Sequence, residues 1–206
     1  MDEQLRTVFK NITGSLPDLD SISPASVPNI DLYMDQITSF MDDELSGCKR
    51  YPHEKILTKT MINNYTKNNL IPPPKKKKYS KEHLLLLIFV YYMKDFLSIS
   101  DIRKILNPLS ARFFNNKKGI TLPEVYNTIF SLENKQAENI TDDIQRKYKE
   151  AKKAFPNAEP DDEEYLRTFS LICLLSYDVY IKKQLIERLV DNMNEDGNLC
   201  LPESDP

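Results

Sequence analysis

Residues 57–93 read LTKTMINNYTKNNLIPPPKKKKYSKEHLLLLIFVYYM, and the order of features within this stretch decides the fold. Its first apolar residues recur at the three- and four-residue spacing of a helix: Met61, Ile62, Tyr65 and Leu70. Thr58 precedes them as a candidate N-cap. Pro72–Pro74 follow, and proline cannot continue a helix. The pattern therefore predicts a short helix over Lys59–Asn69.

A ten-residue apolar run, Leu84–Met93, comes next. A membrane-spanning helix needs about 20 apolar residues. We therefore expect this run to be a buried helix that begins at Ser80, and we expect no membrane association. The stretch between the two helices, Leu70–Tyr79, is the one place where we expect β-structure, in the form of a small wing.

The segments on either side of this stretch also predict helices. Upstream, Asn29–Leu45 carries an amphipathic stripe of apolar residues. Downstream, Ser98 and Asp101 form the S-x-x-D pattern of a capping box. That box predicts a helix that ends before Pro108, since proline interrupts helical hydrogen bonding.

The C-terminal part of the chain contains two further predicted helices, separated by a break at Pro156–Pro160. Thr121 and Glu124 give the first of them a capping box. The second runs from Asp161 to about Met193 and is rich in aromatic side chains: Tyr165, Phe169, Tyr177 and Tyr180. We expect these aromatic side chains to be core, with a ligand pocket or a dimer face as alternatives.

Composition excludes several classes of function. The four glycines are not clustered, so we expect no phosphate-binding loop. Three widely spaced cysteines and two histidines give neither a disulfide framework nor a zinc-ligand pattern. No nucleophile–base–orienter set is visible, and the first ten residues lack a secretory signal. We therefore expect a cytoplasmic protein that is not an enzyme and holds no cofactor or metal.

Positive charge is concentrated in residues 49–82. That window holds ten Lys or Arg residues and two acids, a net charge of +8, whereas the whole chain carries −3. Such a patch attracts polyanions, with an affinity that falls as salt rises. Although a run of four lysines is usually a solvated loop, this run lies beside a polar-faced helix. Lysine and asparagine side chains on such a helix reach phosphates and base edges in a major groove.

The stretch Leu57–Leu84 resembles the DNA-binding domain of MerR-family regulators. In that family a recognition helix with a tyrosine leads into a proline, a basic wing that ends in Arg/Lys-x-Tyr, and a helix. Phe96–Leu106, which reads FLSISDIRKIL, is similar to the next helix of that family. The resemblance implies a winged helix-turn-helix. Asn64 replaces an arginine of the family, and the wing has lysines without Gly-Tyr-Arg, so phosphate contact is expected to outweigh base reading.

The chain as a whole also resembles a family of Gram-positive bacterial proteins known as domain of unknown function 1836 (DUF1836). Three segments carry this resemblance: IDLYMDQITSF (Ile30–Phe40), MINNYTK (Met61–Lys67) and KKYSKEH (Lys77–His83). The resemblance spans residues 25–190 and implies the same MerR-like winged helix.

These features predict an all-α protein: an N-terminal arm or linker over 1–27, a MerR-like winged helix-turn-helix domain over 28–107, a helical C-terminal region over 118–195, and a disordered tail over 196–206. We expect it to bind double-stranded DNA as a transcriptional regulator. A homodimer is expected because paired half-sites compensate for one short reading helix. The expected groove contacts are Lys59, Asn63, Asn64 and Lys67, and the expected phosphate contacts are Lys75, Lys76, Lys77 and Lys78. Tyr79 would anchor the wing on the core.

The alternative is a protein-interaction module that keeps the winged-helix fold without binding DNA. The lysine run would then meet an acidic partner or the acidic N-terminal part of the same chain. Residues 1–48 hold nine acids and two bases, so an intramolecular contact of this kind has the charge it needs.

Overall fold

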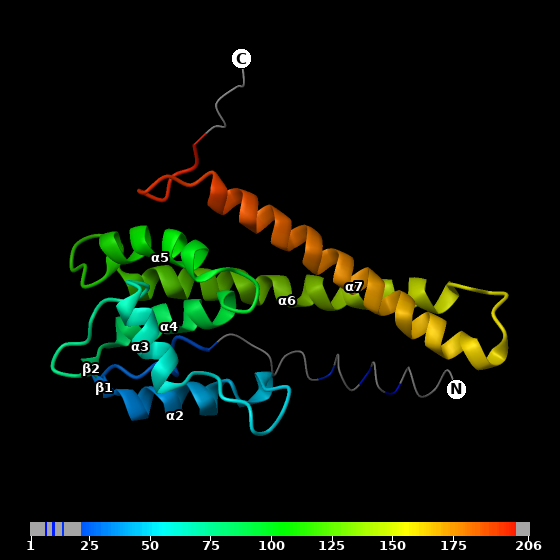
Figure 1. Ribbon diagram of the computed structural model, residues 1–206, viewed down its shortest axis with the longest axis horizontal. Helices are drawn as coiled ribbons and strands as arrows, with labels where there is room; N and C mark the ends of the chain where they lie inside the picture. Colours follow the sequence, from blue (N-terminus) through cyan, green and yellow to red (C-terminus); the bar gives the residue numbers. More distant parts are fainter. Residues whose placement is uncertain (1–6, 8–9, 11–13, 15–21, 201–206) are drawn as a thin grey trace, which may run out of the picture. The chain divides into compact units, whose positions relative to one another are not determined.

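The computed structural model describes residues 7, 10, 14 and 22–200 (Figure 1). Within this part the chain is mostly helical, as the sequence predicts. The described residues fall into two compact units. The core unit comprises residues 22–131 and 186–200, and the two-helix unit comprises residues 132–185 with residues 7, 10 and 14.

The elements of the core unit follow one another in a simple order. They are β1 Leu32–Tyr33, α2 Met34–Glu44, the 3-10 turn η2 Ser46–Cys48, α3 Lys59–Lys67, β2 Lys78–Tyr79, α4 Lys81–Met93 and α5 Ile99–Phe113. Two long helices, α6 Leu122–Lys153 and α7 Pro160–Asp191, contribute residues to both units.

Helix α4 lies at the centre of the core unit. Leu84, Leu85, Leu86, Leu87 and Ile88 are all fully buried. The same apolar cluster takes residues from α2, α3, α5 and the start of α6: Ile37, Met41, Ile62, Tyr65, Ile102, Leu106, Leu122 and Tyr126. Apolar neighbours therefore surround α4, which is why a helix without a polar face is stable there.

The two strands form a small antiparallel sheet in which Leu32 pairs with Tyr79 and Tyr33 with Lys78. This pairing corrects the prediction of a helix from Asn29, because α2 begins only at Met34. The backbones of Leu32 and Tyr33 pair with β2. Tyr33 is the N-cap of α2, and its N–H donates to Gln36 Oε1 at 2.9 Å. The amphipathic spacing upstream gave no sign of a partner strand more than forty residues away.

The end of the N-terminal arm belongs to the core unit. Ile22 and Val27 are buried in the main cluster. The Ile22 N–H donates to the Tyr92 hydroxyl at 3.2 Å, and the Tyr126 hydroxyl donates to the Ile22 carbonyl at 2.5 Å. Residues 22–27 thus lie on the domain, while the rest of the predicted arm falls outside the described residues, apart from residues 7, 10 and 14.

Helix α5 continues through Pro108 to Phe113, so the predicted stop at this proline is wrong. Leu109 and Phe113 beyond the proline pack against the core cluster, which favours continuation despite the lost hydrogen bond. The predicted start is confirmed, because the Asp101 N–H donates to Ser98 Oγ at 3.2 Å in a capping box.

The chain keeps a defined path after α7 as far as Cys200. Met193 and Leu199 form a β-bridge, and the Cys200 N–H donates to the Asn192 carbonyl at 2.8 Å. Gly197 has a φ of +80°, and a Cβ there would lie 2.9 Å from Pro108 Cβ, so this turn requires glycine for both its backbone angle and its close packing. The remainder of the predicted tail, 201–206, lies outside the described residues.

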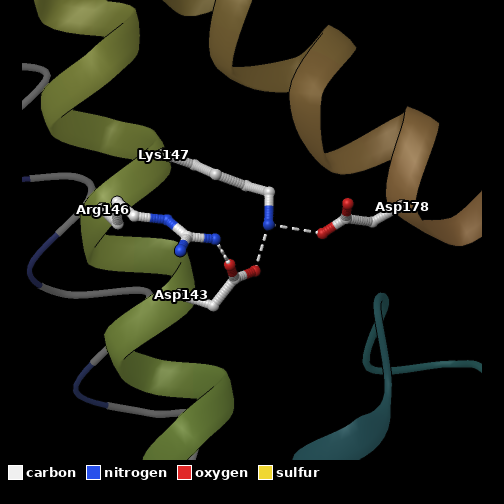
Figure 2. A network of polar contacts seen from close by, with 4 residues as sticks. All are labelled: Asp143, Arg146, Lys147 and Asp178. Atoms are coloured by element: carbon white, nitrogen blue, oxygen red, sulfur yellow. Dashed lines mark hydrogen bonds and ion pairs between the residues drawn. The ribbon is translucent and has the colours of Figure 1, made fainter.

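The two-helix unit pairs the second part of α6 with most of α7. A network of ion pairs joins them (Figure 2): Lys147 on α6 contacts Asp143 on its own helix and Asp178 on α7, the latter at 2.6 Å. The aromatic side chains of α7 are exposed, including Tyr165, Phe169, Tyr177 and Tyr180. This corrects the expectation that they form core.

Candidate nucleic-acid interface

Helix α3 turns one polar face away from the core. Ile62 and Tyr65 are buried, whereas Lys59, Asn63, Asn64 and Lys67 are all exposed. Successive helical residues are rotated by about 100°, so Asn63, Asn64 and Lys67 share the side opposite Ile62 and Tyr65. Lys59, one turn before Asn63, lies at the edge of this outward face. The structure therefore brings together all four residues predicted to face a groove. Thr60 is exposed on the same side, and the same periodicity would have found it.

Both ends of α3 are fixed by local hydrogen bonds. The Met61 N–H donates to Thr58 Oγ1 at 3.2 Å, which confirms Thr58 as the N-cap. At the other end Asn69 takes a φ of +56°, and the Leu70 N–H donates to the Tyr65 carbonyl at 2.9 Å. This is a Schellman end with asparagine in the left-handed position, so α3 has little freedom to fray.

Lys75–Lys78 form a two-residue hairpin turn, the lysine turn. The Lys75 and Lys78 backbones exchange two hydrogen bonds, each 3.0 Å long. Lys76 and Lys77 have φ values of +53° and +63°, which define the type I′ family of turns. Asn-Gly usually occupies these two positions because other residues are strained there. The strain is thus borne by the two lysines at the tip of the turn.

Tyr79 ties the lysine turn to α3. Its ring is buried against the core, as expected of an anchor. Burial raises the pKa of the Tyr79 phenol, and a hydrogen bond with the Thr66 side chain moderates that rise. Thr66 is half-buried and lies three residues after Asn63, at the edge of the outward face of α3, so Tyr79 places the lysine turn next to this face.

The sheet adds a contact that the sequence did not reveal. Lys78 Nζ lies over the ring of Tyr33, 5.1 Å from its centroid. A cation at this position is held by the ring quadrupole. Only the pairing of β1 with β2 brings Tyr33 to the lysine turn, and no local pattern in the sequence connects the two.

The lysine turn presents its side chains largely to solvent. Lys75, Lys76 and Lys77 are exposed and Lys78 is half-buried. Among the described residues, no Asp or Glu forms an ion pair with any of these four lysines. Their charges are therefore available to an anion.

Lys59 differs from the other predicted contacts because it forms an ion pair with Asp35 on α2. Both side chains are well exposed, and exposed pairs contribute at most about 1 kcal/mol. The pair thus competes weakly with a phosphate. Lys49, within the same basic window, is paired with Asp42 at 2.7 Å and is more buried, so it takes no part in the interface.

His83 contacts Tyr79 and Ser80, the two residues that follow the lysine turn. The Ser80 N–H donates to His83 Nδ1 at 3.0 Å, and the ring meets Tyr79 and Phe114 edge-on. Burial lowers the pKa of His83, opposed by the Pro73 and Pro72 carbonyls and by the charge of Asp31. The ring is thus part of the edge of the core, where burial disfavours its charged form.

The connection between α2 and α3 is longer than that of a typical helix-turn-helix. Residues 45–58 separate the two helices and include η2, whereas the common motif uses a turn of about 3–4 residues. The two helices still pack against each other, and Ile56 and Leu57 of the connection are buried. With this longer connection the outward face of α3 is exposed.

No helix among the described residues is long and apolar enough to cross a membrane. The same residues hold no group of three or more His, Cys, Asp or Glu side chains that would suit a metal ion.

The fold and this surface define a helical protein with a small two-stranded sheet, a polar-faced helix and a cationic turn. The model of the DUF1836 family, a domain of unknown function, matches residues 22–129. Because that match covers more than half of the chain, the protein belongs to the DUF1836 family. The match begins at the buried Ile22 and ends within α6, so it coincides closely with the first segment of the core unit. No curated protein and no solved structure matches the chain significantly.

Proposed function

We propose that the protein binds double-stranded DNA as a transcriptional regulator, in a winged helix-turn-helix arrangement of the MerR kind. Helix α3 enters the major groove with Lys59, Asn63, Asn64 and Lys67. The lysine turn acts as the wing and contacts phosphates of the same duplex.

The observation that carries the proposal is the link between these two parts. The outward face of α3 and the lysine turn are joined through Tyr79 and Thr66. A protein surface that contacts both a groove and its flanking phosphates gains from such a rigid connection, because ordering two mobile parts costs entropy on binding.

The side chains of α3 and those of the lysine turn suit different contacts with DNA. Asparagine amides make paired hydrogen bonds with adenine edges, and Asn63 and Asn64 are exposed for such contacts. Lysine ammonium groups meet phosphates as point charges without a fixed geometry. The lysine turn therefore supplies affinity for any sequence, and α3 supplies the preference for one.

A salt titration of duplex binding tests this proposal. Replacing Lys76 and Lys77 by Asn and Gly removes two charges and leaves a sequence suited to the type I′ turn. We expect weaker binding and a log–log salt slope that is smaller by about 1.8, since each phosphate contact contributes about 0.9. The matched control is Lys117→Ala with Lys118→Ala, which removes two charges from exposed lysines elsewhere in the core unit.

Two results would overturn the proposal. One is a duplex affinity and salt slope that are the same for the wing variant and the native protein. The other is binding to polyglutamate that depends on Lys76 and Lys77, in the absence of duplex binding. The second result would identify the alternative, a module that binds an acidic protein partner.

A further inference from the structure

Helix α7 presents an uncovered apolar face in the two-helix unit. Six large side chains between positions 165 and 180 remain about half to two-thirds exposed: Tyr165 67%, Phe169 49%, Ile172 55%, Tyr177 65%, Val179 64% and Tyr180 58%. They recur over four helical turns. Monomeric proteins rarely leave a contiguous apolar patch of this size in water.

The packing of α7 against α6 determines which face of α7 stays exposed to solvent. Leu171 is buried, and Asp178 is held by Lys147 of α6 at 2.6 Å (Figure 2). At about 100° per residue, Phe169 and Ser176 project from the side opposite Leu171 and Asp178, and Ile172 lies at the edge of that side. The buried lysine therefore sets the rotation of α7 and directs the aromatic stripe outward.

This outward face carries no charge. Residues 165–181 contain two charged side chains, Arg167 and Asp178. Arg167 is paired with Glu163 on its own helix, and Asp178 is paired with Lys147. A partner that binds by charge, such as a nucleic acid or a basic peptide, finds no complement here, whereas a second uncharged apolar face fits without repulsion.

The exposed area matches one side of a dimer interface. An aromatic side chain offers about 150–250 Å² when fully exposed. At the fractions given above, the four aromatic side chains leave roughly 500 Å² in water by that scale, and Ile172 and Val179 add the exposed 55% and 64% of their own surface. A stable protein–protein interface buries about 800 Å² on each partner. Two copies of this face therefore supply what one specific dimer needs.

We propose that this face of α7 binds the same face of a second copy of the chain. Two α6–α7 pairs then form a four-helix bundle, in which the exposed apolar face of α7 lies inside. A two-fold dimer needs a self-complementary patch, and an uncharged stripe with the small side chains Cys173 and Ser176 at its centre meets that need. The proposal goes beyond DNA binding and does not depend on it.

The solution mass of the full chain tests this dimer. The native protein is expected at twice its 24.0 kDa chain mass in sedimentation or light scattering. Phe169→Glu with Ile172→Glu should weaken association roughly 100-fold or more, since unpaired charges would be buried at the interface. The matched control, Ile120→Glu with Leu199→Glu, changes two equally exposed apolar residues of the core unit and should stay dimeric. Circular dichroism checks that both variants fold.

Cysteine labelling supplies a second readout within the same molecule. Cys173 lies beside Ile172 on the outward face, and Cys200 lies in the core unit, both exposed in the single chain. Maleimide labelling of Cys173 should slow as the protein concentration rises, while labelling of Cys200 should not change. The double-glutamate variant should lose this concentration dependence.

Two outcomes would overturn the dimer proposal. A native protein of single-chain mass at all concentrations is one. Protection of Cys173 that does not vary with concentration is the other, since it would mean that another segment of the same chain covers the face. Neither measurement contains DNA, so failure here is separate from failure of duplex binding.

Discussion

Helix α4 and the middle of α7, residues 165–181, are both rich in apolar side chains, yet they end in opposite environments. Leu84–Ile88 of α4 are fully buried, whereas Phe169, Ile172 and Tyr180 of α7 are about half exposed. The difference lies in their neighbours. Other elements of the core unit surround α4, while among the described residues of the two-helix unit α7 is held to α6 by the Lys147–Asp178 ion pair and leaves much of its apolar surface exposed. The hydrophobicity of a helix thus indicates that its apolar side chains need neighbours to bury them. The tertiary structure shows whether the same chain supplies those neighbours.

The first prediction measures this contrast directly with one substitution in each helix. Leu86→Ala in α4 should lower the free energy of unfolding by about 2–5 kcal/mol, because a buried leucine leaves a cavity. Leu185→Ala in α7, where the leucine is mostly exposed, should cost less than about 0.5 kcal/mol. Urea unfolding followed by circular dichroism gives both values. Equal losses would contradict the difference in burial on which the comparison depends.

The second prediction concerns strain on the surface of the core unit. Lys76→Asn with Lys77→Gly should raise the free energy of unfolding by about 0.5–1 kcal/mol, since asparagine and glycine adopt positive φ with less strain. Chemical denaturation measures the change. Lys75→Ala removes a neighbouring charge at a position of negative φ and should leave stability nearly unchanged. A loss of stability in the double variant would mean that the type I′ turn is not the native conformation.

The third prediction, with the smallest expected effect, is a pH dependence of the free energy of unfolding that arises from His83 in the core unit. Burial keeps the pKa of His83 below its ordinary value of about 6.5. Below that pH the unfolded chain binds a proton that the folded protein resists, so the free energy of unfolding should fall as the pH decreases from 7 towards the folded-state pKa. Thermal unfolding at a series of pH values measures this trend.

His83→Gln is the control for this trend. Glutamine at the third helical position continues to accept from the cap, but it does not titrate. The variant should therefore lose the part of the pH dependence that His83 contributes. If native protein and variant follow the same curve, the imidazole is not the group responsible.

Local chemistry made much of the core unit predictable. Helix ends depend on residues nearby in the sequence, such as the N-cap Thr58, the Ser98–Asp101 capping box and the prolines Pro72–Pro74. Helices α3 and α4 accordingly begin and end close to their predicted limits. Contacts between distant residues were not predictable in this way. The pairing of Leu32 with Tyr79 shortened α2 at its start, and packing of Phe113 carried α5 past Pro108.

The candidate interface likewise combines features that the local sequence predicts with contacts that it does not predict. Helical periodicity was sufficient to place Asn63, Asn64 and Lys67 on one outward face with Lys59 at its edge, because that periodicity is a property of the backbone. The pairing of Lys59 with Asp35, the ring of Tyr33 beneath Lys78 and the link from Tyr79 to Thr66 each join separate elements. Such contacts depend on how the elements pack and have no counterpart in local sequence.

The sequence by itself determined which segments are helical, where their ends are capped and where positive charge gathers, since these follow from short-range hydrogen bonding and from composition. Only the tertiary structure decided which apolar helix is covered and which lysines are paired. Burial and ion pairing depend on residues far away in the chain, and the aromatic stripe of α7, predicted as core, is the clearest case.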